Sequence, residues 1–364
     1  MAPRYANRSE FKHENTNRDF IDNMRCILHI GTEKTGSTAI QEFLYHNRIE
    51  LRDLRLHVCT SAGRANNRAL PAAFMAEKRT DDFLLTMNHQ SASDRRAWKS
   101  EFLQAFSEEV EEARENADTF VISSEHFHSR LFSREEVSEL HSFLAPLFDS
   151  ISVICYLRRQ DQLALSRYSE ALRAGHVPPS PLPKDMAKKK HRLLPYFDLL
   201  ALLERWADVF GQDNIEPHIY SKKSLLDGDI VTDFLAAVGI EFPHTAQITQ
   251  EKANIALSAE AQAILLGVNK NLGQGDMDST ARIRNKLVQY LQENAPGKSH
   301  QPSASQAREF YQCFEAANDV IARRWFNRES LFETDFSEYP EKAQDVSTEK
   351  VVDILAGFMV QQAK

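Results

Sequence analysis

Short apolar runs alternate with amphipathic stretches along residues 25–239. Four runs have the length and composition of buried strands: residues 25–30, 119–123, 151–156 and 214–220. Between and after them, apolar residues recur at helical spacing in residues 40–51, 102–114, 161–175, 196–210 and 229–238. Strands that alternate with helices indicate a parallel, doubly wound sheet with helices on both faces. In such a sheet, ligands bind at the carboxyl ends of the strands.

The ends of the chain and one loop depart from this pattern. Residues 1–20 are too polar to bury much surface and are expected to form a flexible arm. From about residue 250 the pattern is mainly helical, which predicts a helical C-terminal extension of a single domain that spans residues 21–364. Four prolines in residues 176–183, followed by the basic run 188–192, exclude regular structure there. This segment is either a surface loop or a mobile lid.

Composition narrows the function and the compartment. The chain has 364 residues, of which 42% are hydrophobic, and its formal net charge is −8, which argues against broad nucleic-acid binding. No apolar stretch reaches the length of a transmembrane helix, and the N-terminus lacks the apolar core of a signal peptide. Four widely spaced cysteines match no metal or redox motif. Free thiols in a reducing compartment, and therefore a cytoplasmic location, are the simplest expectation.

A glycine-bounded loop follows the first strand. Gly31 and Gly36 are separated by four residues, and Thr38 supplies the final hydroxyl, as in a nucleotide-binding P-loop. The lysine that should follow the second glycine is replaced by Ser37, and Lys34 is the only lysine of the loop. The loop amides and the helix N-terminus can still bind phosphate. A purely structural turn is the alternative interpretation.

Two motifs carry a resemblance to a known family. Residues 34–38, Lys34-Thr35-Gly36-Ser37-Thr38, resemble the 5′-phosphosulfate loop of sulfotransferases, which use 3′-phosphoadenosine 5′-phosphosulfate (PAPS). Arg158 after the third strand and Ser166 on the next helix resemble the family's 3′-phosphate motif. The resemblance covers residues 25–239. The tryptophan after the loop and the C-terminal Arg-Lys-Gly element of the cytosolic branch are missing, so the chain is more similar to bacterial, carbohydrate-type members.

The resemblance also implies a base for the acceptor hydroxyl. In the family this base follows the strand between the two PAPS motifs, where this chain has Glu125 and then His126. Glu125 matches the family position and is the first candidate, with His126 second. If both residues are extended, their side chains point in opposite directions. Two other interpretations are that Glu125 caps the next turn, and that Glu125, His126 and His128 bind a metal.

These observations predict a three-layer, P-loop-type α/β fold that carries a PAPS-dependent sulfotransferase. Lys34, Thr35, Gly36, Ser37 and Thr38 would bind the 5′-phosphosulfate end of the donor, and Arg158 and Ser166 the 3′-phosphate. The product would be adenosine 3′,5′-bisphosphate, and no metal would be required. The acceptor would be a carbohydrate, a glycolipid or a small alcohol, bound by loops within residues 60–95 and 176–195. An ATP-dependent small-molecule kinase and a non-catalytic nucleotide-binding protein are the alternatives.

Overall fold

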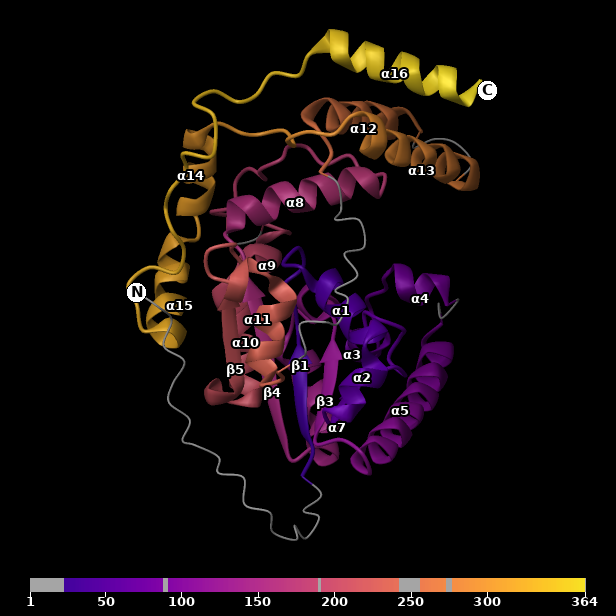
Figure 1. The fold of residues 1–364 in the computed structure, drawn as a ribbon, viewed down its shortest axis with the longest axis vertical. Helices are drawn as coiled ribbons and strands as arrows, with labels where there is room; N and C mark the ends of the chain where they lie inside the picture. Colours follow the sequence, from indigo (N-terminus) through magenta and orange to yellow (C-terminus); the bar gives the residue numbers. More distant parts are fainter. Residues whose placement is uncertain (1–22, 88–90, 189–190, 242–255, 273–276, 364) are drawn as a thin grey trace.

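The computed structural model describes the chain except residues 1–22, 88–90, 189–190, 242–255, 273–276 and 364, so the predicted N-terminal arm lies outside the described residues. Its centre is a sheet of five parallel strands in the order β2-β3-β1-β4-β5 (Figure 1). The strands are β1 (Arg25–His29), β2 (Leu56–Val58), β3 (Thr119–Ser123), β4 (Ser150–Leu157) and β5 (Ile215–Ile219). Each neighbouring pair in this order is joined by backbone hydrogen bonds, so the sheet is continuous.

Helices cover both faces of the sheet. One face packs against α5 (Ala92–Arg114), α7 (Arg134–Leu144) and α10 (Leu199–Phe210). The other packs against α1 (Ser37–His46), α2 (Arg48–Asp53) and α11 (Ile230–Val238). Alternate strand residues supply the two faces: Cys26 and Leu28 lie in the first core and Ile27 in the second. The predicted three-layer α/β architecture is confirmed.

Three local predictions are corrected by the structure. Strand β2 was not predicted, because its three residues are too short to show an alternation. Asp161, which the sequence indicates as the N-cap of the helix over residues 161–175, lies inside α8 (Gln160–Arg173), whose N-cap is Arg159. The Asp161 carboxylate instead accepts hydrogen bonds from Arg159 and Tyr339. The expected helix over residues 196–210 is two helices, α9 (Leu194–Phe197) and α10. Asp198 separates them and caps α10 by accepting a hydrogen bond from the Ala201 amide.

The remaining helices build the end of the molecule that faces the carboxyl ends of the strands. Helix α8 lies above the sheet, and α12 (Ala259–Leu272), α13 (Met277–Asn294) and α16 (Thr348–Gln362) stack on it (Figure 1). Leu172 on α8 and Leu265 on α12 belong to the separate apolar cluster that holds this stack together. The mainly helical C-terminal part is thus observed, and its assignment with the sheet to one domain stays a prediction.

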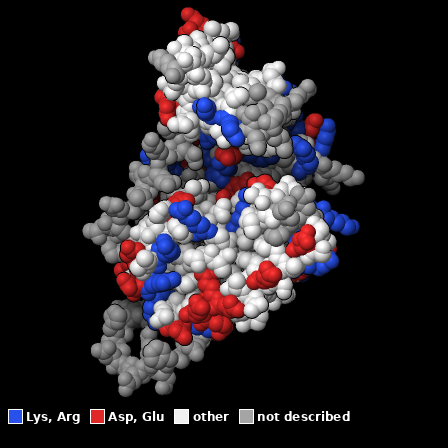
Figure 2. Space-filling view, turned by 90° about the vertical axis from the view of Figure 1, so that its right-hand side faces the viewer, with Lys and Arg blue, Asp and Glu red and all other residues white. Residues whose placement is uncertain are grey.

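Short helices complete the chain. They are α3 (Ala69–Phe74), α4 (Asp82–Thr86), α6 (His126–Arg130), α14 (Ala304–Gln312) and α15 (Glu315–Phe326). Helices α14 and α15 contribute Tyr311 and Ile321 to the core that also covers the α10 face of the sheet. Seen from the side, the molecule is hollowed between the upper helical stack and the α/β part, and both acidic and basic residues gather along this hollow (Figure 2).

Candidate functional site

The loop between β1 and α1 is shaped by two glycines with positive φ angles. At Gly31 φ is +99°, and an added β-carbon would lie 3.1 Å from the Cα atom of Glu125. At Gly36 φ is +82°, and an added β-carbon would lie 3.0 Å from Ile230 and 3.2 Å from the Tyr220 ring. Only glycine permits both the backbone conformation and these close approaches. The loop is therefore in direct contact with the ends of β3 and β5.

Hydrogen bonds within and around the loop fix its shape. The carbonyl of Thr32 accepts from the hydroxyls of Thr35 (2.6 Å) and Ser37 (3.3 Å). The amide of Thr32 donates to the carbonyl of Tyr156 (2.9 Å). The amides of Lys34, Thr35 and Gly36 donate to no other group in the described part of the chain. These amides, together with the N-terminus of α1, are available to an anion.

Lys34 connects the loop to two other elements. Its ammonium nitrogen lies 3.2 Å from a carboxylate oxygen of Glu170, near the end of α8, in a partly exposed ion pair. Its carbonyl accepts a hydrogen bond from Nη1 of Arg158 at 2.9 Å. The two residues that the sequence assigned to separate phosphate motifs are thus in contact.

Arg158 is a half-buried cation with few partners. Its guanidinium lies 5.5 Å from the centre of the Tyr220 ring, and its Nε atom is buried and makes no hydrogen bond to any described residue. Burial lowers the pKa of this guanidinium. No carboxylate forms an ion pair with it among the residues that the structure describes, whereas the adjacent Arg159 is paired with Asp161 and Glu338. A half-buried guanidinium that has a buried, unpartnered Nε and no ion-paired carboxylate has the properties of an anion-binding group.

Ser166, the second member of the predicted 3′-phosphate motif, is half-buried on α8. It precedes Glu170 by four residues and so lies on the same face of the helix as this partner of Lys34. No hydrogen bond joins Ser166 to Arg158 within the described residues. A cavity of about 730 Å³ lies beside Tyr220, and Gln162, one turn before Ser166, belongs to its lining. Its other walls carry both basic and acidic side chains, among them Lys222, Lys223, Arg328, Glu329, Glu333, Asp335 and Glu338.

Glu125 lies at the end of β3, next to the loop. Its backbone is helical (φ −68°, ψ −12°), and it is the residue that precedes α6, so the condition under which Glu125 and His126 would point in opposite directions is not met. The Glu125 side chain does not cap this helix. Instead its carboxylate accepts a hydrogen bond of 2.6 Å from the side-chain amide (Nε2) of Gln41, a buried residue of α1. Gln41 therefore holds the carboxylate on the side of the loop.

His126 follows at the first position of α6. Its Nδ1 atom is buried and has no hydrogen-bond partner among the described residues. Burial lowers the pKa of His126, and the positive charges of Arg68 and Arg130 lower it further. The negative charges of Glu125 and Glu33 act in the opposite direction. A lowered pKa keeps the imidazole neutral, and a neutral imidazole can accept a proton.

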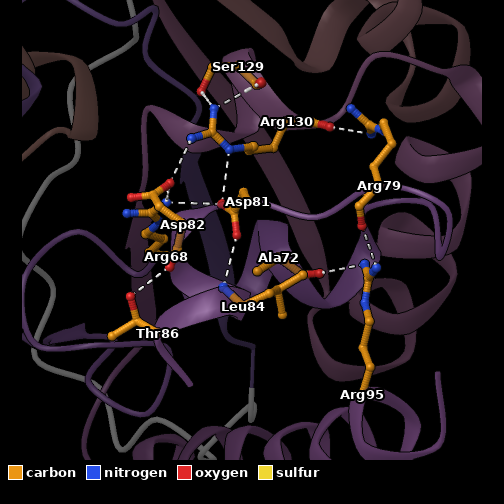
Figure 3. A network of polar contacts seen from close by, with 10 residues as sticks. All are labelled: Arg68, Ala72, Arg79, Asp81, Asp82, Leu84, Thr86, Arg95, Ser129 and Arg130. Atoms are coloured by element: carbon orange, nitrogen blue, oxygen red, sulfur yellow. Dashed lines mark hydrogen bonds and ion pairs between the residues drawn. The ribbon is translucent and has the colours of Figure 1, made fainter. Parts of the chain in front are cut away.

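A network of charged residues fixes the far end of α6 (Figure 3). Asp81 accepts hydrogen bonds from Arg68 and Arg130, both at 3.0 Å, and also from the Leu84 amide at the start of α4. Burial alone would raise the pKa of Asp81, but these donors lower it to about 2. The ionised Asp81 thus joins α3, α4 and α6, and it holds the helix that begins with His126.

A further set of contacts joins Glu33 of the loop to His128 and Tyr196. None of the three was assigned to nucleotide binding from the sequence, where His128 entered only in the metal-binding alternative. The Tyr196 hydroxyl donates to the Glu33 carboxylate (2.9 Å), and the Glu33 amide donates to Nδ1 of His128 (3.2 Å). Since Nδ1 is an acceptor, the proton of the neutral ring is on Nε2, which donates to the carbonyl of Tyr196 (3.0 Å). Burial lowers the pKa of His128 to about 4. The neutral histidine thus joins the loop to α9.

The structure bears on the metal-binding alternative and on the expectation that the chain has no transmembrane helix. Among the described residues, no group of three or more His, Cys, Asp or Glu side chains is arranged to hold a metal ion. The ring of His128 is occupied on both nitrogens by the contacts to Glu33 and Tyr196. Within the described part of the chain, no helix combines the length and apolar character that crossing a membrane demands.

Comparisons with known proteins give limited similarity. No model of a known protein family matches the chain. An uncharacterised protein from Archaeoglobus fulgidus is 28% identical over 209 residues, which are 56% of this chain and 54% of that protein, so the chain spans about half the length of this curated relative. A solved sulfotransferase structure from Alicyclobacillus acidocaldarius is similar with a TM-score of 0.39 and 15% identity, over 71% of this chain and 98% of that chain. The function is therefore inferred from the site itself.

Proposed function

We propose that this protein is a sulfotransferase that moves a sulfuryl group from PAPS to an acceptor hydroxyl. The observation that carries the proposal is the hydrogen bond between Arg158 and the carbonyl of Lys34. A half-buried guanidinium without an ion-paired carboxylate is suited to a ribose 3′-phosphate, and it adjoins a loop whose free amides are suited to a 5′-phosphate. A nucleotide with phosphates on both the 3′ and 5′ positions satisfies both groups at once.

The loop would bind the 5′ end of the donor in a way that differs from the sequence-based expectation. The hydroxyl of Ser37 is directed to the carbonyl of Thr32, so the amides of residues 34–36 and the exposed Thr38 are the groups left for the phosphosulfate. Tyr220 adjoins both Gly36 and Arg158, and the cavity beside it would take the nucleoside. Ser166 would face the donor from α8.

Lys34 would stabilise the leaving group. As the acceptor oxygen forms its bond to sulfur, the bond between sulfur and the 5′-phosphate oxygen breaks, and negative charge develops on that oxygen. Lys34 is held near this position by an ion pair with Glu170 that is partly exposed and hence worth about 0–1 kcal/mol. A pair this weak can be exchanged for the phosphosulfate. Adenosine 3′,5′-bisphosphate is then the product.

Glu125 would take the proton of the acceptor hydroxyl. Gly31 brings the backbone of Glu125 against the loop, and Gln41 orients its carboxylate there. Two neighbouring helical residues project about 100° apart, so Glu125 and His126 reach different parts of the site. The unpartnered Nδ1 of His126 keeps it as the second candidate.

A thermal-shift screen without added metal tests the donor assignment. The ligands are adenosine 3′,5′-bisphosphate, AMP and, in separate wells with Mg²⁺, ATP. A ligand that binds only the folded state at 100 times its Kd stabilises it by about 2.7 kcal/mol. We expect a shift of several degrees with the bisphosphate and a much smaller one with AMP. A large shift with ATP and Mg²⁺, and none with the bisphosphate, would indicate a kinase and refute the proposal.

A further inference from the structure

A second cavity, of about 630 Å³, lies between α8 and the proline-rich segment that precedes α9. Its volume is within the range of roughly 300–1,000 Å³ that is typical of small-molecule sites. Arg167 and Ala171 of α8 form one side. The other side is formed by residues His176, Val177, Pro178, Pro179, Ser180, Pro183, Lys184, His191, Arg192 and Leu193. The proline-rich segment of residues 176–183, for which the sequence allows either a surface loop or a lid, thus contributes to a wall of this cavity.

The ionisable side chains that line this cavity are all basic. Arg167, Lys184 and Arg192 carry permanent positive charges, and His176 and His191 add two imidazoles. None of these cations forms an ion pair within the described residues, and no Asp or Glu belongs to the lining. The chain as a whole has a formal net charge of −8, so this accumulation of basic residues is local.

The neighbouring carboxylates are engaged elsewhere. Asp185 follows Lys184 in the chain, and its carboxylate lies 2.9 Å from the ammonium of Lys188, outside the cavity lining. Glu170, one turn after Arg167, pairs with Lys34. Lys188 lowers the pKa of Asp185, with smaller contributions from His191 and Lys184, so Asp185 offsets part of the cavity's charge from a distance. Because no ion pair is formed within the described residues, the cavity's basic side chains can still pair with a ligand from solution.

The uncharged part of the lining is rigid and apolar. Pro178, Pro179 and Pro183 restrict the backbone of the wall, and Val177 and Leu193 add apolar surface. A wall held in one conformation loses little entropy when a ligand binds. Apolar surface next to cations suits a ligand with C–H faces and anionic substituents, as a sugar acid or a sugar sulfate has.

The cavity is connected to the loop through Tyr196. The guanidinium of Arg167 lies 5.3 Å from the centre of the Tyr196 ring, and the Tyr196 hydroxyl donates to Glu33, the residue before Lys34. Arg158 and Tyr220 contact the loop through a different set of contacts, at Lys34 and Gly36. The loop therefore has one contact region suited to a donor nucleotide and another that leads to the basic cavity.

We propose that this cavity binds an anionic group of the acceptor, and that the acceptor is an oligosaccharide with carboxylate or sulfate substituents. The identification of the ligand as the sulfuryl acceptor rests on the proposed function, whereas the anion site itself does not depend on it. Arg167, Lys184 and Arg192 would bind the anionic group. The sugar hydroxyl to be sulfated would then extend toward Lys34 and Glu125.

Calorimetry with defined oligosaccharides tests the proposal. The charged probes are tetragalacturonate and sulfated maltotetraose, which separate a carboxylate from a sulfate preference. The neutral probes are the methyl ester of the tetragalacturonate and maltotetraose. The test variant is the double substitution Lys184→Gln and Arg192→Gln at two exposed positions. The matched control is Arg323→Gln with Lys350→Gln, which removes the same charges from exposed positions outside the cavity.

We expect saturable binding of at least one charged probe to the wild type, and weakening by about tenfold or more in the test variant but not in the control. Adenosine 3′,5′-bisphosphate should bind both variants as it binds the wild type. Equal binding of charged and neutral probes, equal losses in the two variants, or no binding of either charged probe at millimolar concentration would overturn the anion site. If the bisphosphate fails to bind the wild type while the charged probe behaves as expected, the donor assignment fails and the anion site stands.

Discussion

Replacement of Arg158 by alanine separates the two contributions that the structure gives this residue. One is structural, because the guanidinium donates a hydrogen bond of 2.9 Å to the carbonyl of Lys34 and so supports the loop. The other is the proposed contact with the 3′-phosphate, for which the buried Nε has no competing partner among the described residues. AMP lacks the 3′-phosphate, so it measures the first contribution alone. Adenosine 3′,5′-bisphosphate measures both.

The magnitudes differ enough to be resolved. Loss of the hydrogen bond from the guanidinium to the Lys34 carbonyl changes the loop itself, so it should weaken AMP and the bisphosphate by the same factor. Loss of a charge-assisted bond to phosphate costs a further 1.5–3 kcal/mol or so, which is roughly a ten- to hundredfold loss with the bisphosphate alone. Arg158→Lys keeps the charge without the planar group, so an intermediate affinity is expected.

Calorimetric titration of the wild type and both variants with each ligand provides the comparison. Thermal unfolding of the free proteins serves as the control for folding. If Arg158→Ala weakens AMP and the bisphosphate by the same factor, then Arg158 only supports the loop and the 3′-phosphate is bound elsewhere. That result would refute the assignment on which the proposed function rests.

Other substitutions test the chemistry and the loop support. Lys34→Ala should leave a folded protein and lower kcat by about 10²–10³, because a preorganised charge at the leaving group is lost; retention of a third of the activity would contradict this role. Glu125→Gln should preserve bisphosphate binding and abolish most turnover, while His126→Asn should be milder; the reverse ranking would make His126 the base. Burial lowers the pKa of His128 to about 4 in the folded protein, against 6.5 for an exposed histidine in the unfolded chain. As the pH falls, the unfolded chain therefore binds a proton at this residue before the folded protein does. Through this group the free energy of unfolding should decrease by about 3 kcal/mol between pH 7 and about pH 4. When the free energy of unfolding is measured by urea denaturation at several pH values, His128→Gln should lack this part of the pH dependence. An unchanged pH dependence would exclude His128 as its source.

The sequence predicts the features that depend on neighbouring residues. Alternation in the first strand sends Cys26 and Ile27 to opposite faces of the sheet, as observed. The spacing of Gly31 and Gly36 predicts a loop that ends at a helix, and both glycines have the positive φ angles that such a loop needs. Helix α10 ends at Gly211, as its pattern indicates. Local periodicity and turn chemistry are sufficient for these elements.

Contacts between distant segments were not predictable in the same way. Tyr196 reaches Glu33 across 163 residues of sequence, and Gln41 reaches Glu125 across 84. From the sequence, Tyr196 belonged only to the apolar face of a helix, and Gln41, within the helix predicted over residues 40–51, had no assigned role. Their roles follow from how the strands are ordered in the sheet, which brings α1, α6 and α9 to the same edge. Spacing along the chain carries no signal for such an arrangement.

Transfer of the sulfuryl group itself is the most direct test of the central claim. The protein is incubated with PAPS labelled with ³⁵S in the sulfuryl group and with charged and neutral oligosaccharides, and the labelled products are separated by chromatography. The account predicts label on an oligosaccharide hydroxyl, equimolar formation of adenosine 3′,5′-bisphosphate, and loss of both in Lys34→Ala. Label transfer that persists in Lys34→Ala, or no transfer to any of the oligosaccharides by a wild-type protein that binds the bisphosphate, would contradict it.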